Sequence, residues 1–134
     1  MKNLRIVEMD HIVLNVSDVE RSFAFYTGVL GLKGERVEDF RAGKVGFPSV
    51  RISEGTLIDL MRSEKTAAPG DASRNLNHYC LVSESLDLTE LAAALKSQDV
   101  PVVREPVSRW GARGQATSIY ILDPDGNEIE IRCY

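Results

Sequence analysis

The stretch that decides the fold lies near the C-terminus and reads SIYILDPDGNEIEI, residues 118–131. Pro124 presets the backbone φ angle for a turn, and Gly126 tolerates the positive φ that tight turns often require. The residues on either side of the turn are rich in isoleucine and lack helical spacing. The stretch therefore predicts two strands joined by a tight turn.

Side chains of the second predicted strand alternate between its two faces. One face carries Glu128, Glu130 and Arg132, and the other carries Ile129, Ile131 and Cys133. A carboxylate in the middle of a strand is costly to bury without a partner. Glu130 is therefore expected to be solvated, ion-paired or bound to a metal ion.

Length and composition indicate a soluble, single-domain protein. The 134 residues are enough for one domain with a real core, and the 27% of charged residues is ordinary for a globular chain. The net charge of −4 argues against nucleic acid or an anionic membrane as partner. The N-terminal residues lack the apolar core of a signal peptide, and Cys80 and Cys133 form no CxxC pair. We therefore expect a cytoplasmic protein with reduced thiols.

The predicted elements repeat. Unit one spans about residues 5–62, a linker covers 63–75, and unit two spans about 76–134; each unit is a strand, a helix and three strands. The predicted strands are 6–16, 32–39, 44–53, 56–62, 76–83, 102–108 and the two strands of the closing hairpin. The first helix is capped by Ser17 or Asp18 and stopped by Gly31, and the second ends near Asp99. Units of this size are too small to bury a good core alone, so they should pack or swap with another unit.

The repeat aligns four polar residues in two pairs. Residues 55–60, GTLIDL, align without a gap with residues 126–131, GNEIEI, so Asp59 and Glu130 occupy equivalent positions. His11 and His78 both fall in the first strand of their unit. Two imidazoles with one or two carboxylates on rigid strands suit a divalent cation, either Fe(II) or, with a fourth ligand, Ni, Co, Zn or Mn.

Each of these residues also has a plainer interpretation. A lone histidine is often a hydrogen-bonded structural residue. The chain contains only two histidines, and the repeat gives both the same position, which favours the metal site. Asp59 is a fourth ligand, a base or a solvated strand residue. Tyr120, across the hairpin from Glu130, is an acid or base, or an aromatic core residue with a hydrogen-bonded hydroxyl.

Further candidates follow from strand alternation and from a loop. Side chains two residues along from the four positions share their faces and would line the pocket or fill it as core: Val13, Met61, Cys80 and Arg132. Cys80 is a thiol near the ion or an inert buried cysteine. Residues 110–115 form a glycine-bearing loop that could close over a substrate, with Arg113 meeting an anionic group, or that could simply be solvated.

Three segments match a known sequence pattern: residues 10–18, DHIVLNVSD, residues 22–32, SFAFYTGVLGL, and residues 123–130, DPDGNEIE. Through these segments the chain resembles the vicinal oxygen chelate superfamily of glyoxalases, bleomycin-resistance proteins and extradiol dioxygenases. It is similar in particular to stand-alone, single-domain glyoxalase-domain proteins. The resemblance implies an α+β fold in which paired βαβββ units form half-open barrels around a metal ion. It also implies a homodimer whose sites can take ligands from both chains.

Within that resemblance, His11, His78 and Glu130 match the metal-ligand positions of the family. Asp59 falls where glyoxalase I has a glutamate ligand, which puts that assignment in doubt. Tyr120 matches a pocket tyrosine of extradiol dioxygenases and fosfomycin-modifying transferases. The lack of a third histidine weakens the dioxygenase interpretation, and Val13 replaces a threonine of the fosfomycin enzymes. Bleomycin-sequestering relatives lack the metal ligands that this chain has.

These observations predict a metal-dependent enzyme whose ion binds two oxygens of a small substrate and stabilises an enediolate or related oxyanion. A glyoxalase-like lyase or isomerase is slightly favoured over an Fe(II) extradiol-type dioxygenase. The alternative from another class is a metal-free protein that sequesters a drug or metabolite between two chains. The substrate itself is not indicated.

Overall fold

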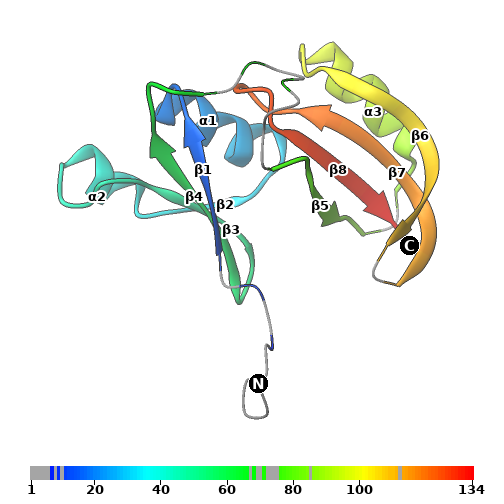
Figure 1. Ribbon diagram of the computed structural model, residues 1–134, viewed down its shortest axis with the longest axis horizontal. Helices are drawn as coiled ribbons and strands as arrows, with labels where there is room; N and C mark the ends of the chain where they lie inside the picture. The colour runs from blue at the N-terminus through cyan, green and yellow to red at the C-terminus, as the bar shows by residue number, and fades with distance from the viewer. Residues whose placement is uncertain are drawn as a thin grey trace. The chain divides into compact units, whose positions relative to one another are not determined.

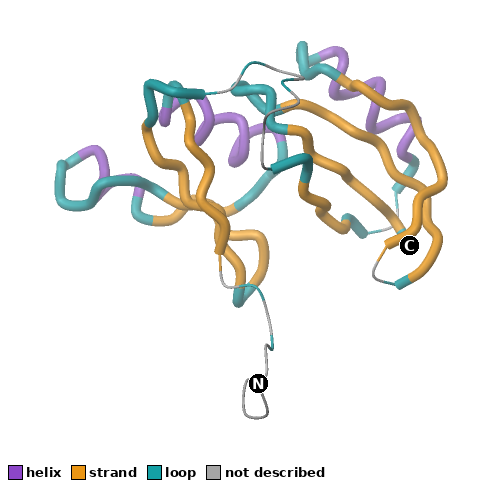
Figure 2. Tube along the Cα trace, viewed as in Figure 1, coloured by secondary structure: helices purple, strands orange, loops and turns teal. Residues whose placement is uncertain are grey.

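The computed structural model describes residues 7, 9, 11–66, 68, 71, 76–84, 86–111 and 113–134. The chain divides into two compact units, Met1–Thr66 and Ala67–Tyr134, and each unit is described by itself (Figures 1 and 2). Most of the predicted linker at 63–75, and most of the start of the first predicted strand, lie outside the described residues.

The first unit is a four-stranded sheet with short helices. Its elements are β1 (His11–Val16), α1 (Val19–Ala24), the π-helical turn η1 (Phe25–Val29), β2 (Lys33–Glu35), α2 (Val37–Arg41), β3 (Ser49–Ser53) and β4 (Thr56–Arg62). The strand order is β1-β4-β3-β2. The outer strand β1 runs parallel to β4, and the other pairs are antiparallel.

The second unit repeats this topology. Its elements are β5 (Tyr79–Val82), α3 (Leu88–Ser97), β6 (Val102–Gly111), β7 (Gly114–Leu122) and β8 (Glu128–Cys133). The strand order is β5-β8-β7-β6, with β5 parallel to β8. The predicted α+β class and the strand, helix, three-strand repeat are therefore confirmed.

The core of the second unit lies between α3 and the sheet face against which α3 packs (Figure 1). Ile119, Ile121 and Ile129 are fully buried on that face, and α3 buries Leu88, Ala92 and Leu95. Alternation along β7 and β8 sends the intervening side chains to the opposite face. The apolar face thus fixes which residues the other face can offer for chemistry.

Helix ends in both units follow their capping signals. Asp18 accepts a hydrogen bond from the backbone of Arg21 at 3.0 Å, which confirms the predicted start of the first helix. Asp87 caps α3 by accepting from the backbones of Thr89 and Glu90. Asp99 has a φ of 59° just beyond α3, as the predicted helix end requires.

Three predicted strand boundaries were wrong. The strand predicted at 32–39 covers only Lys33–Glu35 and is followed by α2, and the strand predicted at 44–53 begins at Ser49. Gly43, with a φ of 74°, lies where α2 ends, and the chain becomes extended only after Pro48. His78 lies immediately before β5 and not within a strand.

The predicted loop at 110–115 is instead the tight end of a hairpin. β6 continues to Gly111 and β7 begins at Gly114, which has a φ of 98°. Glycine adopts this backbone angle without the steric penalty of a side chain, so the two strands can reverse over very few residues. On β1, the side chains of His11, Val13 and Asn15 are exposed.

No helix in the described part of the chain is long and apolar enough to span a membrane.

The packing of the second unit predicts a contrast between two alanine variants. Ile121 is fully buried, so we expect Ile121→Ala to lower the free energy of unfolding by about 2–5 kcal/mol. Val103, on β6, is 46% exposed, so Val103→Ala should cost less than about 1 kcal/mol. Urea denaturation of both variants measures the difference, and equal losses would contradict the described core.

Candidate metal centre

The carboxylate of Glu130 is held on β8 with little exposure to solvent. The residue is 5% exposed. Its Oε1 accepts hydrogen bonds from Ser118 Oγ at 2.6 Å and from Arg132 Nη1 at 3.3 Å. Both donors engage the same oxygen. The other oxygen, Oε2, therefore stays available to a further partner.

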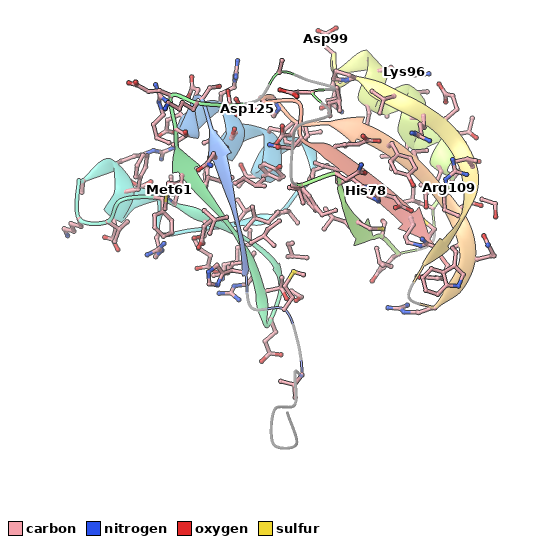
Figure 3. The ribbon with its side chains drawn as sticks, viewed as in Figure 1. Met61, His78, Lys96, Asp99, Arg109 and Asp125 are labelled. Atoms are coloured by element: carbon pink, nitrogen blue, oxygen red, sulfur yellow. The ribbon has the colours of Figure 1, made fainter. Side chains whose placement is uncertain are left out.

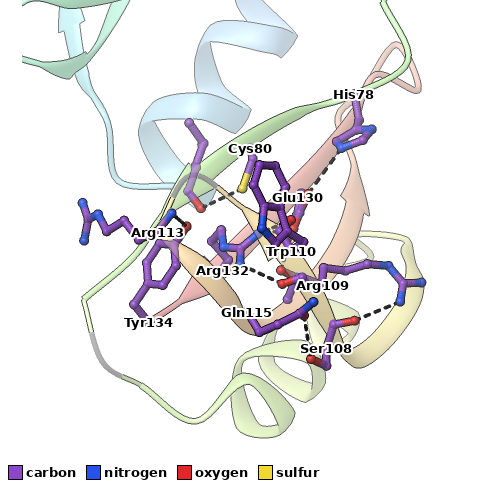
Figure 4. A network of polar contacts seen from close by, with 12 residues as sticks. His78, Cys80, Ser108, Arg109, Trp110, Arg113, Gln115, Glu130, Arg132 and Tyr134 are labelled. Carbon is purple, nitrogen blue, oxygen red and sulfur yellow. Dashed lines mark hydrogen bonds and ion pairs between the residues drawn. The ribbon is translucent and has the colours of Figure 1, made fainter.

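That partner is His78, whose Nε2 lies 3.3 Å from Glu130 Oε2 (Figure 4). The other ring nitrogen, Nδ1, lies 2.7 Å from Asn77 Oδ1. An amide oxygen only accepts, so Nδ1 carries a proton, and Nε2 would offer its lone pair to a cation bound between it and Glu130. A second-nitrogen contact of this kind orients and polarises metal-ligating histidines.

The spacing of these two donor atoms fits a shared cation. Metal–nitrogen and metal–oxygen bonds of about 2.1 Å, at tetrahedral or octahedral angles, place two ligand atoms about 3.0–3.4 Å apart. The 3.3 Å between His78 Nε2 and Glu130 Oε2 falls within that range. The second unit thus presents a nitrogen and an oxygen donor that suit a divalent ion.

The first unit contains an equivalent pair. Asp59 is 8% exposed, and its Oδ1 accepts a hydrogen bond from Ser49 Oγ at 2.6 Å. Asp59 Oδ2 lies 4.0 Å from His11 Nε2, which is longer than the pair in the second unit. The aspartate side chain is one methylene shorter than glutamate and does not reach as far toward the imidazole.

The strand register confirms that the two pairs are equivalent positions. Asp59 pairs with the residue two beyond His11, namely Val13. Glu130 pairs with the residue two beyond His78, namely Cys80. Each unit therefore holds one histidine and one carboxylate at the same register of a parallel strand pair.

Neither unit completes a metal site by itself. Within the described ranges, no group of three or more His, Cys, Asp and Glu side chains could hold a metal ion. Two histidines with a carboxylate require donors from both units. The set of His11, His78 and Glu130 therefore stays a prediction.

Tyr120 lies directly beside the carboxylate. It pairs with Glu130 across β7 and β8, is 6% exposed, and meets the His78 ring edge-on at 5.6 Å between centroids. Burial and then the negative charge of Glu130 raise the pKa of its hydroxyl, and Arg109 partly offsets them. The phenol is therefore protonated at neutral pH and can act as a hydrogen-bond donor.

Arg132 ties the end of the β6–β7 hairpin to Glu130. It is 3% exposed and donates to the backbone carbonyls of Arg109 at 2.9 Å, Trp110 at 3.2 Å and Gly114 at 3.1 Å. Its guanidinium also lies 4.7 Å from the centre of the Tyr134 ring. These contacts occupy most of its donors, so Arg132 holds the carboxylate and the hairpin in place.

Cys80 is exposed, so the prediction of a buried cysteine was wrong. Its position opposite Glu130 still affects its chemistry. Desolvation of the sulfur and the Glu130 charge raise the pKa of the Cys80 thiol to about 11, while Arg132 acts in the opposite direction. The thiol is therefore protonated and weakly nucleophilic at neutral pH, which agrees with an inert cysteine.

The remaining candidate residues, Val13, Met61 and Arg113, differ in exposure and in contacts. Val13 is 47% exposed and Met61, which Figure 3 labels, is 39% exposed, both on the sheet face of the first unit that carries Asp59. Arg113 donates its backbone N–H to the hydroxyl of Tyr134 at 3.0 Å, and its guanidinium lies 5.0 Å from that ring. Arg113 is thus engaged with the C-terminal tyrosine (Figure 4).

Sequence reasoning missed the residues that orient the carboxylates and the imidazole, namely Ser49, Ser118 and Asn77. Ser118 could have been found, because it lies two residues before Tyr120 and alternation puts both on one face. Asn77 could not, since its contact depends on the backbone before β5.

The fold and the paired donors define a class of protein that matches a known family. The model of the Glyoxalase/Bleomycin resistance protein/Dioxygenase superfamily matches residues 8–131, and the chain belongs to this family. The family includes many enzymes as well as non-enzymatic binding proteins. Its members generally bind a divalent metal ion.

Individual relatives extend over nearly the whole chain. The virulence protein STM3117 of Salmonella typhimurium is 32% identical over 96% of this chain and 85% of its own. A lactoylglutathione lyase of Neisseria meningitidis is 30% identical over 90% of this chain and 86% of its own. The solved structure of an integron cassette protein from the mobile metagenome of V. cholerae has a TM-score of 0.75 and 29% identity, with 98% of both chains covered.

The contacts of Arg132 predict a large effect on stability. Arg132→Gln leaves a buried carboxylate without its cation and three carbonyls without their donor, so we expect a loss of about 3–5 kcal/mol in the free energy of unfolding. As a control, Arg41→Gln breaks exposed ion pairs with Glu20 and Glu38 and should cost less than about 1 kcal/mol. Urea denaturation of the metal-free protein measures both, and a loss as small as that of the control would contradict this role.

Proposed function

We propose that the chain is a divalent-metal-dependent enzyme that acts on a small oxygen-bearing substrate. The observation that supports it most is the His78–Glu130 pair, with both side chains oriented by neighbours and their donor atoms 3.3 Å apart. Membership of a family whose members generally bind a metal ion agrees with it.

The proposed ligands are His11, His78 and Glu130. This set is the two-histidine, one-carboxylate combination, which leaves positions open for substrate. The donors would come from both units, either within one chain or across the homodimer that we also propose. Asp59 is a fourth ligand or a base, since one of its oxygens is held by Ser49 and the other faces His11.

The bound ion would supply Lewis-acid stabilisation of the negative charge that develops on substrate oxygens. The residues of the chain would do the rest. Ser118 and Arg132 hold Glu130 through one oxygen, which keeps the other aimed toward His78. Tyr120, protonated and next to Glu130, would donate a hydrogen bond or a proton to the substrate.

Among the reaction types, we favour a glyoxalase-like lyase or isomerase. The Neisseria relative is named a lactoylglutathione lyase, and a protonated tyrosine beside the ligands suits proton transfer at an oxygen. An Fe(II) extradiol-type dioxygenase is the second candidate, because the same ligand combination suits Fe(II). We also propose that the protein lies in the cytoplasm, where reducing conditions would keep Cys80 and Cys133 as thiols.

Metal content tests the proposal directly. Protein purified without added ions should contain near-stoichiometric Fe, Ni, Zn, Mn or Co, and His78→Ala and Glu130→Gln should each lower metal affinity at least about tenfold. Elemental analysis and the rise in melting temperature on adding metal provide the readouts.

The matched control is Glu105→Gln, which makes the same charge change at an exposed β6 residue that pairs with Lys96. It should bind metal like the wild type. A wild-type protein that binds no divalent ion, yet binds a planar organic ligand, would instead support the metal-free sequestering protein.

The reaction type needs a second experiment. Metal-loaded protein is given the hemithioacetal of methylglyoxal and glutathione in one assay and, as the anaerobically loaded Fe(II) form, a catechol with oxygen in another. We expect turnover in the first assay and at least a hundredfold loss of it, a rough figure for a general acid–base group, in Tyr120→Phe. Turnover of the catechol alone would replace the lyase by the dioxygenase.

A further inference from the structure

One row of residues crosses the whole sheet of the second unit. Cys80 pairs with Glu130, Glu130 with Tyr120, and Tyr120 with Arg104. Directly paired residues lie on the same face of a sheet. The face that carries the candidate metal ligand on β8 therefore continues over Tyr120 to an arginine on β6.

A β-bulge brings a second arginine to this face. Arg104 pairs with Tyr120, Val107 with Ser118, and Arg109 with Ala116, with a register shift between Arg104 and Val107. Their partners on β7, Tyr120, Ser118 and Ala116, are spaced two residues apart and therefore share one face of the sheet. The three β6 residues lie on that same face. Without the extra residue of the bulge, Arg104 and Arg109, five positions apart, would lie on opposite faces.

The two guanidinium groups have different surroundings on this face. The Arg104 guanidinium lies over the Tyr120 ring, 5.2 Å from its centre. Arg109 donates through Nη1 to the backbone carbonyl of Ser108 at 3.0 Å (Figure 4). Arg109 lies opposite Ala116 on the same face as Tyr120, and its positive charge partly offsets the rise in the pKa of the Tyr120 hydroxyl.

The charges of these two arginines are not neutralised by the described part of the chain. Arg41, Arg51 and Arg132 each pair with a glutamate. Over the same described residues, neither Arg104 nor Arg109 pairs with a carboxylate. Two unneutralised cations on one face of a chain with a net charge of −4 make a local positive region next to Tyr120.

We propose that Arg104 and Arg109 form an anion-binding subsite beside Tyr120. It takes a carboxylate, phosphate or phosphonate group of the same small molecule whose other oxygens bind the metal ion, so this inference rests on the proposed function. Guanidinium groups bind such oxyanions through paired, charge-assisted hydrogen bonds. Strands are about 4.8 Å apart, so the backbones of Glu130 and Arg104 are separated by about 10 Å. A substrate that spans both sites therefore carries its acid group within about 10 Å of the chelating oxygens.

The test titrates metal-free, full-length protein with methylphosphonate and, separately, with propionate at constant ionic strength. NMR follows the Nε–H signals of the arginines. We expect saturable shifts at Arg104 and Arg109 with at least one anion. The double variant Arg104→Gln/Arg109→Gln should weaken that binding by at least about tenfold. The anion that binds more tightly identifies the acid group.

Two further variants keep the result specific. The double variant Arg104→Lys/Arg109→Lys keeps both charges and should retain weaker but measurable binding. Arg41→Gln and Lys96→Gln combined remove two charges elsewhere and should bind the anion like the wild type. The absence of saturable binding in the wild type, or an equal loss in this charge control, would overturn the subsite.

This test is independent of the metal experiment because no ion is present. Anion binding without metal binding would leave the subsite standing and remove the metalloenzyme. Metal binding without anion binding would support the metalloenzyme and overturn the anion-binding subsite.

Discussion

The structure depends on a carboxylate that β8 keeps almost entirely out of solvent. An unpaired charge at Glu130 would be costly to bury, and the fold offsets that cost through Ser118 and Arg132, both of which bind Oε1. Arg132 in turn holds three carbonyls at the end of the β6–β7 hairpin. One oxygen of Glu130 is thereby fixed and the other faces His78, so the stability of the hairpin and the orientation of the candidate ligand have the same source.

Strand alternation places the core and the candidate site on opposite faces of the same strands. The isoleucines of β7 and β8 pack against α3, and the residues between them form the polar face. A register slip by one residue would move the isoleucines to the polar face and turn Glu130 into the apolar core against α3, so the apolar face determines the chemistry of the other. The same logic holds in the first unit, where Ile58 and Leu60 are buried on either side of Asp59.

Much of this could be predicted from sequence because the signals are local. The repeat followed from aligned glycines and carboxylates, and Asp18 marked a helix start. The features that the sequence did not predict leave no clear local pattern of residues. The short α2 contains too few residues for a clear period, and the hairpin end at Gly114 resembles a loop. The bulge between Arg104 and Val107 is marked only by Pro106, which suits an edge strand equally well. The pairing of Arg132 with Glu130 requires the three-dimensional contact.

In the function that we propose, histidines from the two equivalent units bind one cation together with Glu130. X-ray absorption spectroscopy of the cobalt-loaded protein tests this arrangement most directly, because the imidazole scattering reports the number of histidine ligands. We expect two imidazoles on the ion in the wild type and one in each of His11→Ala and His78→Ala. An imidazole count that does not change when His11 is removed would contradict it.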